Sequence, residues 1–281
     1  MLVNMKTLLE EAEKNGYAVG GFNCATLESA RAAIAAAEEL GVPFILQHAE
    51  VHERYMPLEL AAPIMLALAK QAKVPVCVHL DHGCDFDYVI RAMHLGFTSV
   101  MYDASVKPPE QNAAETAQVV RIAHTLGISV EAELGHMPTS GVDSDGLAPE
   151  DYYTDPAEAA QFVSDTGVDA LAISFGTVHG VYRTQPKLSI PVVERVRKET
   201  GGLPLVMHGG SGVSEADYRA AIAAGIRKIN YYTYEALAGG RGTYDIVRRT
   251  PEGLQFHDVA MNATAFMKEN VLSAMRVFAG K

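Results

Sequence analysis

The chain contains no tryptophan and only three cysteines, Cys24, Cys77 and Cys84, among its 281 residues. The cysteines form no Cys-x-x-Cys pair and are odd in number, which suits a reducing compartment better than a disulfide framework. No apolar run approaches about 18 residues, and the first residues, MLVNMKTLLEEAEKNG, lack the long apolar region of a signal peptide. We therefore expect a cytoplasmic protein with no membrane association.

The sequence also lacks any excess of basic residues. Its formal net charge is −11, with no basic stripe, which argues against nucleic acid as a partner. The negative potential of the whole protein would repel an anionic small molecule, so such a ligand would have to be bound by a local positive group, such as a metal ion or a helix N-terminus. The hydrophobic fraction of 48% is sufficient for a large core and argues against disorder.

One pattern recurs along the chain: a helical stretch, a glycine or short break, and a short apolar strand. It appears in ELGVPFILQ, QAKVPVCVHLD, HLGFTSVMYD, TLGISVEAE, DTGVDALAISF, TGGLPLVMHGG and AAGIRKINYY, and YAVGGFN adds an eighth strand. Strands that are apolar almost throughout are typical of parallel strands covered on both faces. The pattern predicts an α/β fold, a (β/α)8 TIM barrel rather than a doubly wound open sheet, with an extra C-terminal helix over Leu254–Gly280.

Active sites of TIM barrels lie at the carboxyl ends of the strands, so the residues at those ends test for function. The expected ends, in chain order, are Phe22-Asn23, the QHAE stretch 47–50, Asp81-His82, Tyr102-Asp103, Glu131 with Glu133, His179-Gly180, the HGGSG stretch 208–212, and Asn230. Nearly all of them carry ionisable or metal-competent side chains, whereas the opposite ends have VP, FT, IS, VD and LP. This asymmetry favours an active site.

Three strand-end histidines, His82, His179 and His208, each precede a glycine. One such histidine is more often a hydrogen-bonded structural residue, but three at one rim predict a catalytic zinc site with an open position. The HGGSG stretch 208–212, before a helix expected near Ser214, offers backbone N–H groups and a helix dipole to an anion. With KINYYT at 228–233, it predicts a phosphate site built from the last two loops of the barrel.

The phrases HLDHG, GFTSVM, SVEAELG, GVDALAISFGTVHG, PLVMHGGSG and KINxxT occur in order, and through them the chain resembles the class II, zinc-dependent fructose- and tagatose-bisphosphate aldolases. The resemblance covers residues 5–280 and implies a single TIM-barrel domain over residues 1–281. It implies reversible cleavage of fructose 1,6-bisphosphate or a related ketose 1-phosphate to dihydroxyacetone phosphate and an aldehyde. It further implies one catalytic Zn2+, a candidate second divalent or monovalent cation, and a homodimer or homotetramer.

The resemblance also implies roles for individual residues. Asp81 matches the catalytic acid/base, and His82, His179 and His208 match the zinc ligands. Glu133 matches a carboxylate that can ligate a second metal position, with a supporting role for a ligand as the plainer interpretation. The expected contacts of the dihydroxyacetone phosphate end are Asn23, Gly180, Gly209, Gly210, Ser211, Asn230 and Thr233.

Several stretches depart from the family's pattern. The bulky QHAEVHERY replaces a small loop after the second strand, Leu254 stands where bisphosphate enzymes tend to supply an arginine, and Tyr232 replaces a small or polar residue. The loop HMPTSGVDSDG lacks the usual Glu-Asp pair, so the loop proton-transfer role either falls to Asp143 or Asp145 or is lost. We therefore expect a remodelled aldehyde half. Candidates for contacting the distal end of the substrate, each equally plausible as a plain surface residue, are His48, His52, Arg54 and Arg183.

Other functions remain open at this point. A Schiff-base aldolase needs a desolvated lysine at a strand end, and Lys228 and Lys107 are the candidates. A non-catalytic sugar-phosphate sensor or assembly protein could share the fold. A metal-dependent hydrolase is a weaker alternative, because the first strand, GGFNCAT, has no His-x-His pair.

Overall fold

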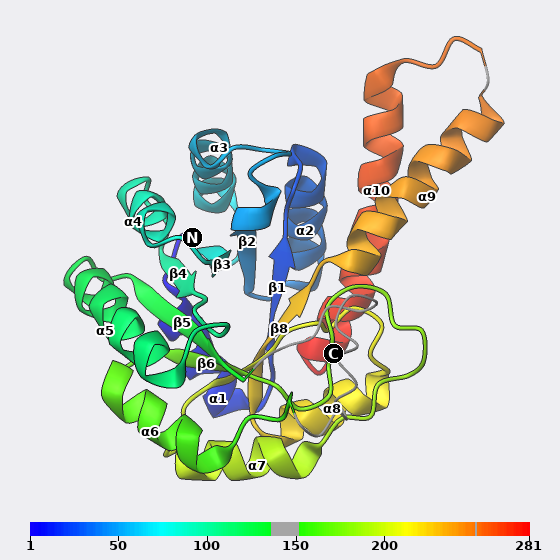
Figure 1. Ribbon diagram of the computed structural model, residues 1–281. Coiled ribbons are helices and arrows are strands. Elements are labelled where there is room, and N and C mark those ends of the chain that lie inside the picture. The colour runs from blue at the N-terminus through cyan, green and yellow to red at the C-terminus, as the bar shows by residue number, and fades with distance from the viewer. Residues whose placement is uncertain (136–151, 251) are drawn as a thin grey trace.

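The computed structural model describes residues 1–135, 152–250 and 252–281 (Figure 1). In these residues, parallel strands close into a barrel in chain order, with the last strand paired to the first. The strands are β1 (Val19–Asn23), β2 (Phe44–Ala49), β3 (Val76–Gly83), β4 (Ser99–Tyr102), β5 (Ser129–Leu134), β6 (Ala170–Ile173), β7 (Leu205–Met207) and β8 (Ile226–Tyr231). The predicted (β/α)8 barrel is confirmed.

Helices alternate with the strands and surround the barrel (Figure 1). They are α1 (Met5–Asn15), α2 (Leu27–Leu40), the 3-10 turn η1 (Glu50–His52), α3 (Leu58–Gln71), α4 (Phe86–His94), α5 (Pro109–Thr125), α6 (Pro156–Thr166), α7 (Ile190–Glu199), α8 (Glu215–Ala224), α9 (Thr233–Arg249) and α10 (Phe256–Phe278). Helix α10 is the extra C-terminal helix that the sequence predicts. No helix among the described residues is long and apolar enough to cross a membrane.

The glycines of the recurring pattern end helices. Gly16, Gly41 and Gly167 follow α1, α2 and α6 with positive φ angles of 68°, 63° and 70°. Glycine adopts this left-handed conformation without a Cβ penalty and lets its N–H bond back to the last helical turn. The short break that the sequence shows before each of these strands is therefore a helix cap.

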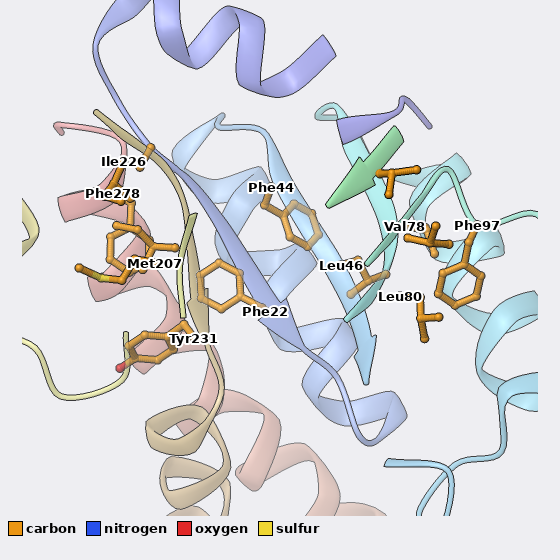
Figure 2. Packing of buried hydrophobic residues seen from close by; sticks show 14 of the residues in the cluster. Phe22, Phe44, Leu46, Val78, Leu80, Phe97, Met207, Ile226, Tyr231 and Phe278 are labelled. Carbon is orange, nitrogen blue, oxygen red and sulfur yellow. The ribbon is translucent and has the colours of Figure 1, made fainter. Parts of the chain in front are cut away.

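Two apolar layers cover the barrel wall and the amino end of the barrel. The larger layer lies between the strands and the surrounding helices, where Phe22, Tyr231 and Phe278 pack together (Figure 2). The smaller layer fills the amino end of the barrel, where Met5 and Leu8 of α1 pack against strand residues such as Ile45. Helix α1 thus covers that end, and polar side chains gather at the other.

Helices α9 and α10 lie side by side, and their far ends project away from the barrel (Figure 1). The C-terminal part of α10 returns to the barrel, where Phe278 is 1% exposed and its ring centroid lies 4.9 Å from that of Tyr218. Phe278 therefore anchors the helical pair to the barrel wall.

Replacing this anchor should destabilise the whole fold. We expect Phe278→Ala to lower the free energy of unfolding by about 3–5 kcal/mol, because it removes a buried ring and leaves a cavity. Leu60→Ala in α3 is the control, since Leu60 is 59% exposed, and should cost less than about 0.5 kcal/mol. Urea unfolding followed by circular dichroism measures both, and equal costs would contradict the anchoring role.

Candidate active site

Three histidines from different βα units meet at the carboxyl end of the barrel. His82 is in β3, His179 follows β6, and His208 follows β7 directly. Their ring centroids lie 4.5 Å (His82 to His208), 5.0 Å (His82 to His179) and 5.9 Å (His179 to His208) apart. One ring nitrogen of each lies within 4.8 Å of the others, so all three can reach one ion between them.

Carboxylates orient two of these rings. The Nδ1 of His82 lies 2.7 Å from Asp103 Oδ2, and the Nε2 of His208 lies 2.8 Å from Glu131 Oε1. The remaining nitrogen of His208, Nδ1, is buried and has no hydrogen-bond partner among the described residues. A carboxylate behind the ring and an unpartnered nitrogen in front, as found at His208, is the usual environment of a metal-binding histidine. The donor set therefore fits a divalent metal that prefers nitrogen ligands.

The local charges favour a cation at this point. Burial lowers the pKa of His208, and burial together with the charge of His82 lowers that of His179 to about 3, which keeps both rings in the neutral form that binds metals. Burial also opposes protonation of His82, but the carboxylates of Asp81 and Asp103 raise its pKa to about 10. The negative potential that holds a proton there would equally attract a metal ion.

Asp81 is held between the first and the last strand. The side-chain amide of Asn23 in β1 donates to its Oδ2 at 2.7 Å, and that of Asn230 in β8 donates to its Oδ1 at 2.8 Å. Burial would raise the pKa of Asp81, but the nearby His82 and Lys228 hold it well below its ordinary value. The side chain is thus an oriented, ionised carboxylate beside the three histidines.

A buried ion pair lies beneath the site. Lys228 Nζ lies 2.8 Å from Glu131 Oε2, and both side chains are fully buried. His79 Nε2 lies 3.6 Å from the same oxygen, and its Nδ1 lies 2.8 Å from Ser99 Oγ. Burial raises the pKa of Glu131, yet Lys228 and His208 hold it down at about 2. His79 therefore lies in the core behind the metal-binding face.

A cavity of about 500 Å³ opens above these groups. Its described lining residues include Asn23, Asp81, His82, Asp103, His179, Gly180, Gly209, Gly210, Ser211, Asn230 and Thr233. His208 and Glu133 lie just below it, with Glu133 Oε2 3.4 Å from His208 Nδ1. The structure thus brings the sequence-predicted metal and substrate residues to one place.

Glycine is required in the turn after β7. A Cβ on Gly209, whose φ is +63°, would lie 2.3 Å from the carbonyl oxygen of Val178. A Cβ on Gly210 would lie 2.7 Å from the carbonyl oxygen of Asn230. Side chains at these positions would block the close approach of a ligand to the backbone, so the glycines serve both packing and access.

The four residues expected to contact the distal end of the substrate lie in different environments. His52 lines the cavity, and its ring centroid lies 4.7 Å from that of Tyr232. His48 is fully buried, with Nε2 3.1 Å from the hydroxyl of Tyr88, and it is not among the described lining residues. Arg54 stacks on Tyr55 and is exposed, as is Arg183. Asp143 and Asp145 lie outside the described residues.

The comparison with known proteins decides the family. Residues 3–281 match the family model described as "Fructose-bisphosphate aldolase class-II". The chain belongs to this family. It is 41% identical over 280 residues to the "Probable fructose-bisphosphate aldolase" of Bacillus subtilis (strain 168), covering 99% of this chain and 97% of the relative. The "Fructose-bisphosphate aldolase" of Staphylococcus aureus (strain Mu50) is 39% identical over 282 residues, with the same coverage.

A solved structure agrees. The YdjI aldolase from Escherichia coli K12 superposes with a TM-score of 0.88 at 34% identity, over 99% of this chain and 97% of that one. The protein is thus a class II aldolase, an aldehyde-lyase of the metal-dependent family. Both lysines that a Schiff-base mechanism could use are paired with glutamates, which disfavours that mechanism. Lys228 pairs with Glu131, and Lys107 pairs with Glu115 at 2.5 Å.

The buried ion pair between Lys228 and Glu131 predicts how substitutions change the free energy of unfolding. Lys228→Met should lower the free energy of unfolding by about 3–5 kcal/mol, because it leaves the charge of Glu131 buried and uncompensated. Adding Glu131→Gln should recover part of that loss by removing the stranded charge. Chemical unfolding of the single and double variants measures the coupling. Additive losses would show that the two side chains do not stabilise each other.

Proposed function

We propose that the protein is a zinc-dependent aldolase that reversibly cleaves a ketose 1-phosphate to dihydroxyacetone phosphate and an aldehyde. The observation that carries this proposal is the oriented carboxylate of Asp81 beside three convergent histidines in an open cavity. A base and a metal site that face the same space suit removal of a proton from a substrate whose carbonyl is polarised.

His82, His179 and His208 would hold the zinc ion, and nitrogen ligands of this number suit zinc with an open position. When bound, the ion supplies Lewis-acid polarisation of the ketone carbonyl. Glu133 belongs to a second convergent set with His82 and Asp103, which supports its role at a second divalent or monovalent cation position. Burial and the charge of Asp103 raise its pKa to about 8, so a cation there would favour the ionised form.

The dihydroxyacetone phosphate end is expected at the turn after β7 and the start of α9. Gly209, Gly210 and Ser211 bring backbone to the cavity, and the hydroxyl of Ser211 accepts from the N–H of Tyr232 at 3.1 Å. Thr233 begins α9, whose N-terminal N–H groups attract an anion. Gly180 and Asn230 complete this wall of the cavity.

Asp81 would carry the proton. In cleavage it accepts the proton of the C4 hydroxyl group while the C3–C4 bond breaks. The electron pair of that bond stays on C3, and C4 becomes the aldehyde carbon. In condensation the proton returns to the C4 oxygen. The amides of Asn23 and Asn230 hold both oxygens of Asp81, so the carboxylate is fixed before the substrate arrives.

The proposal that the substrate is a ketose 1-phosphate rests on the part of the cavity that would bind the aldehyde end of the substrate. None of the cavity's described lining residues is lysine or arginine, and His52 with Tyr232 occupies the wall near β2. Leu254 replaces the arginine that bisphosphate enzymes tend to supply. These features support a substrate whose distal end carries no phosphate group. The names of the relatives point instead to fructose 1,6-bisphosphate, which makes the bisphosphate the first comparison substrate.

Location and assembly are further proposals. Cys24, Cys77 and Cys84 are free thiols, which supports a reducing, cytoplasmic environment. Large apolar side chains are exposed on the projecting helices α9 and α10, among them Tyr244, Val247, Phe256 and Met261. Such a surface supports a homodimer or homotetramer, for which sedimentation is the direct measurement.

Asp81→Asn tests the proton-transfer step. The amide cannot accept the C4 hydroxyl proton, so we expect kcat to fall by about 100- to 10,000-fold with zinc content unchanged. Asp87→Asn is the control, because Asp87 is exposed on α4. Release of dihydroxyacetone phosphate gives the rate, and metal analysis gives the occupancy. Wild-type turnover in Asp81→Asn would remove Asp81 from the mechanism.

Metal removal tests the class of reaction. A chelator should abolish release of dihydroxyacetone phosphate from a panel of fructose and tagatose 1-phosphates and 1,6-bisphosphates, and added zinc should restore it. The 1-phosphates should show the higher kcat/KM. Chelator-resistant cleavage with inactivation by borohydride would favour a Schiff base instead. If the zinc-bound protein releases no dihydroxyacetone phosphate from any of these substrates, the result would favour a sugar-phosphate sensor.

A further inference from the structure

A second cavity, of about 290 Å³, lies beside the catalytic cavity. Asn23 and Tyr232 line both cavities, so the two spaces share a wall at the end of β1 and the start of α9. The remaining walls of the second cavity come from the start of α2, from α9 and from α10. Asn23 also donates to Asp81, so the wall that the two cavities share includes a residue that positions the candidate base.

Glu235 is the unusual residue of this cavity. It lies in the first turn of α9 and lines the cavity, yet its side chain is 1% exposed. Neither carboxyl oxygen has a hydrogen-bond partner among the described residues. A buried polar group without a partner costs folding free energy, and native proteins hold few such groups. A ligand that hydrogen-bonds Glu235 would explain why a carboxyl group occupies this position.

The charges of the cavity restrict that ligand. Its described lining residues include two acidic side chains, Glu28 and Glu235, and none with a basic side chain. A terminal phosphate there would face carboxyl groups without any cation to neutralise it, which is unfavourable. Burial raises the pKa of Glu235 well above its ordinary value, so the neutral carboxyl group can both donate and accept. A hydroxyl group matches both capacities.

We propose that this second cavity binds the distal end of the substrate, and that Glu235 hydrogen-bonds a hydroxyl group on the phosphate-free tail of a ketose 1-phosphate. The proposal rests on the aldolase reaction proposed above and makes Glu235 a specificity-determining residue. Thr243, which also lines the cavity, adds a hydroxyl group on the same side. Dihydroxyacetone phosphate, which has no such tail, would not contact Glu235.

Two variants of Glu235 test this assignment. Glu235→Leu removes the hydrogen bond, and we expect kcat/KM for fructose 1-phosphate or tagatose 1-phosphate, whichever the wild type prefers, to fall about 10-fold, mainly through KM. Glu235→Gln keeps a donor and an acceptor and should retain most of the activity. The matched control is Glu158→Leu, because Glu158 occupies the same helical position in the first turn of α6 and is exposed; it should leave kcat/KM unchanged.

A second measurement separates the two proposals. Enzyme-catalysed exchange of the C3 proton of dihydroxyacetone phosphate with solvent reports on the metal and phosphate half alone. Exchange at the wild-type rate in Glu235→Leu, with the loss confined to ketose cleavage, would support the assignment and show that the variant is folded. Equal kcat/KM in Glu235→Leu and wild type, or a wild-type preference for the bisphosphates, would overturn it while the aldolase reaction stands. Absence of exchange in the wild type would overturn the aldolase proposal itself, and this assignment with it.

Discussion

The pairing of β1 with β8 closes the sheet, and in its register Gly21 lies opposite Asn230. This register brings Asn23 and Asn230, which are far apart in the chain, to the two oxygens of Asp81 on β3. A shift by one residue would turn the side chains of the shifted strand to the other face of the sheet. The position of the candidate base therefore depends on barrel closure, and the covered amino end leaves it only one side on which to meet a substrate.

The pKa values of the carboxyl groups in and around the site differ because the charges around each group differ. All of them are desolvated, which raises a carboxyl pKa. Lys228 overcomes that effect for Glu131, and the cationic neighbours of Asp81 do the same there. For Glu133, burial and the charge of Asp103 outweigh the lowering effect of His82, and for Glu235 burial alone acts, so both pKa values rise. The two cavities thus provide ionised carboxylates for charge and proton transfer, and neutral ones that a cation or a hydroxyl group can engage.

Periodicity predicts the barrel and the strand-end histidines, because a parallel barrel places all carboxyl ends at one rim. It does not predict which strand residues face inward. Gln47 points to Asn23, so its neighbour His48 points the opposite way, to Tyr88; the alternation of strand side chains excludes both from one space. The pairing of Lys228 with Glu131 joins β8 to β5 across the interior, which depends on strand tilt. Glu235 resembles an ordinary first-turn glutamate in the sequence, and its burial depends on tertiary packing that the local pattern does not show.

Among the described residues, no lysine or arginine lines either cavity, and this determines how an anion can bind. With a net charge of −11, the protein repels anions at long range. One phosphate can still be held by backbone N–H groups at the turn after β7 and at the start of α9, whose positive potential is local. A second phosphate at the distal end would meet Glu28 and Glu235 with no comparable turn among the described lining residues. The same charge distribution that admits a ketose phosphate at one end therefore favours hydroxyl groups at the other, and this gives the two halves of the site different chemical requirements.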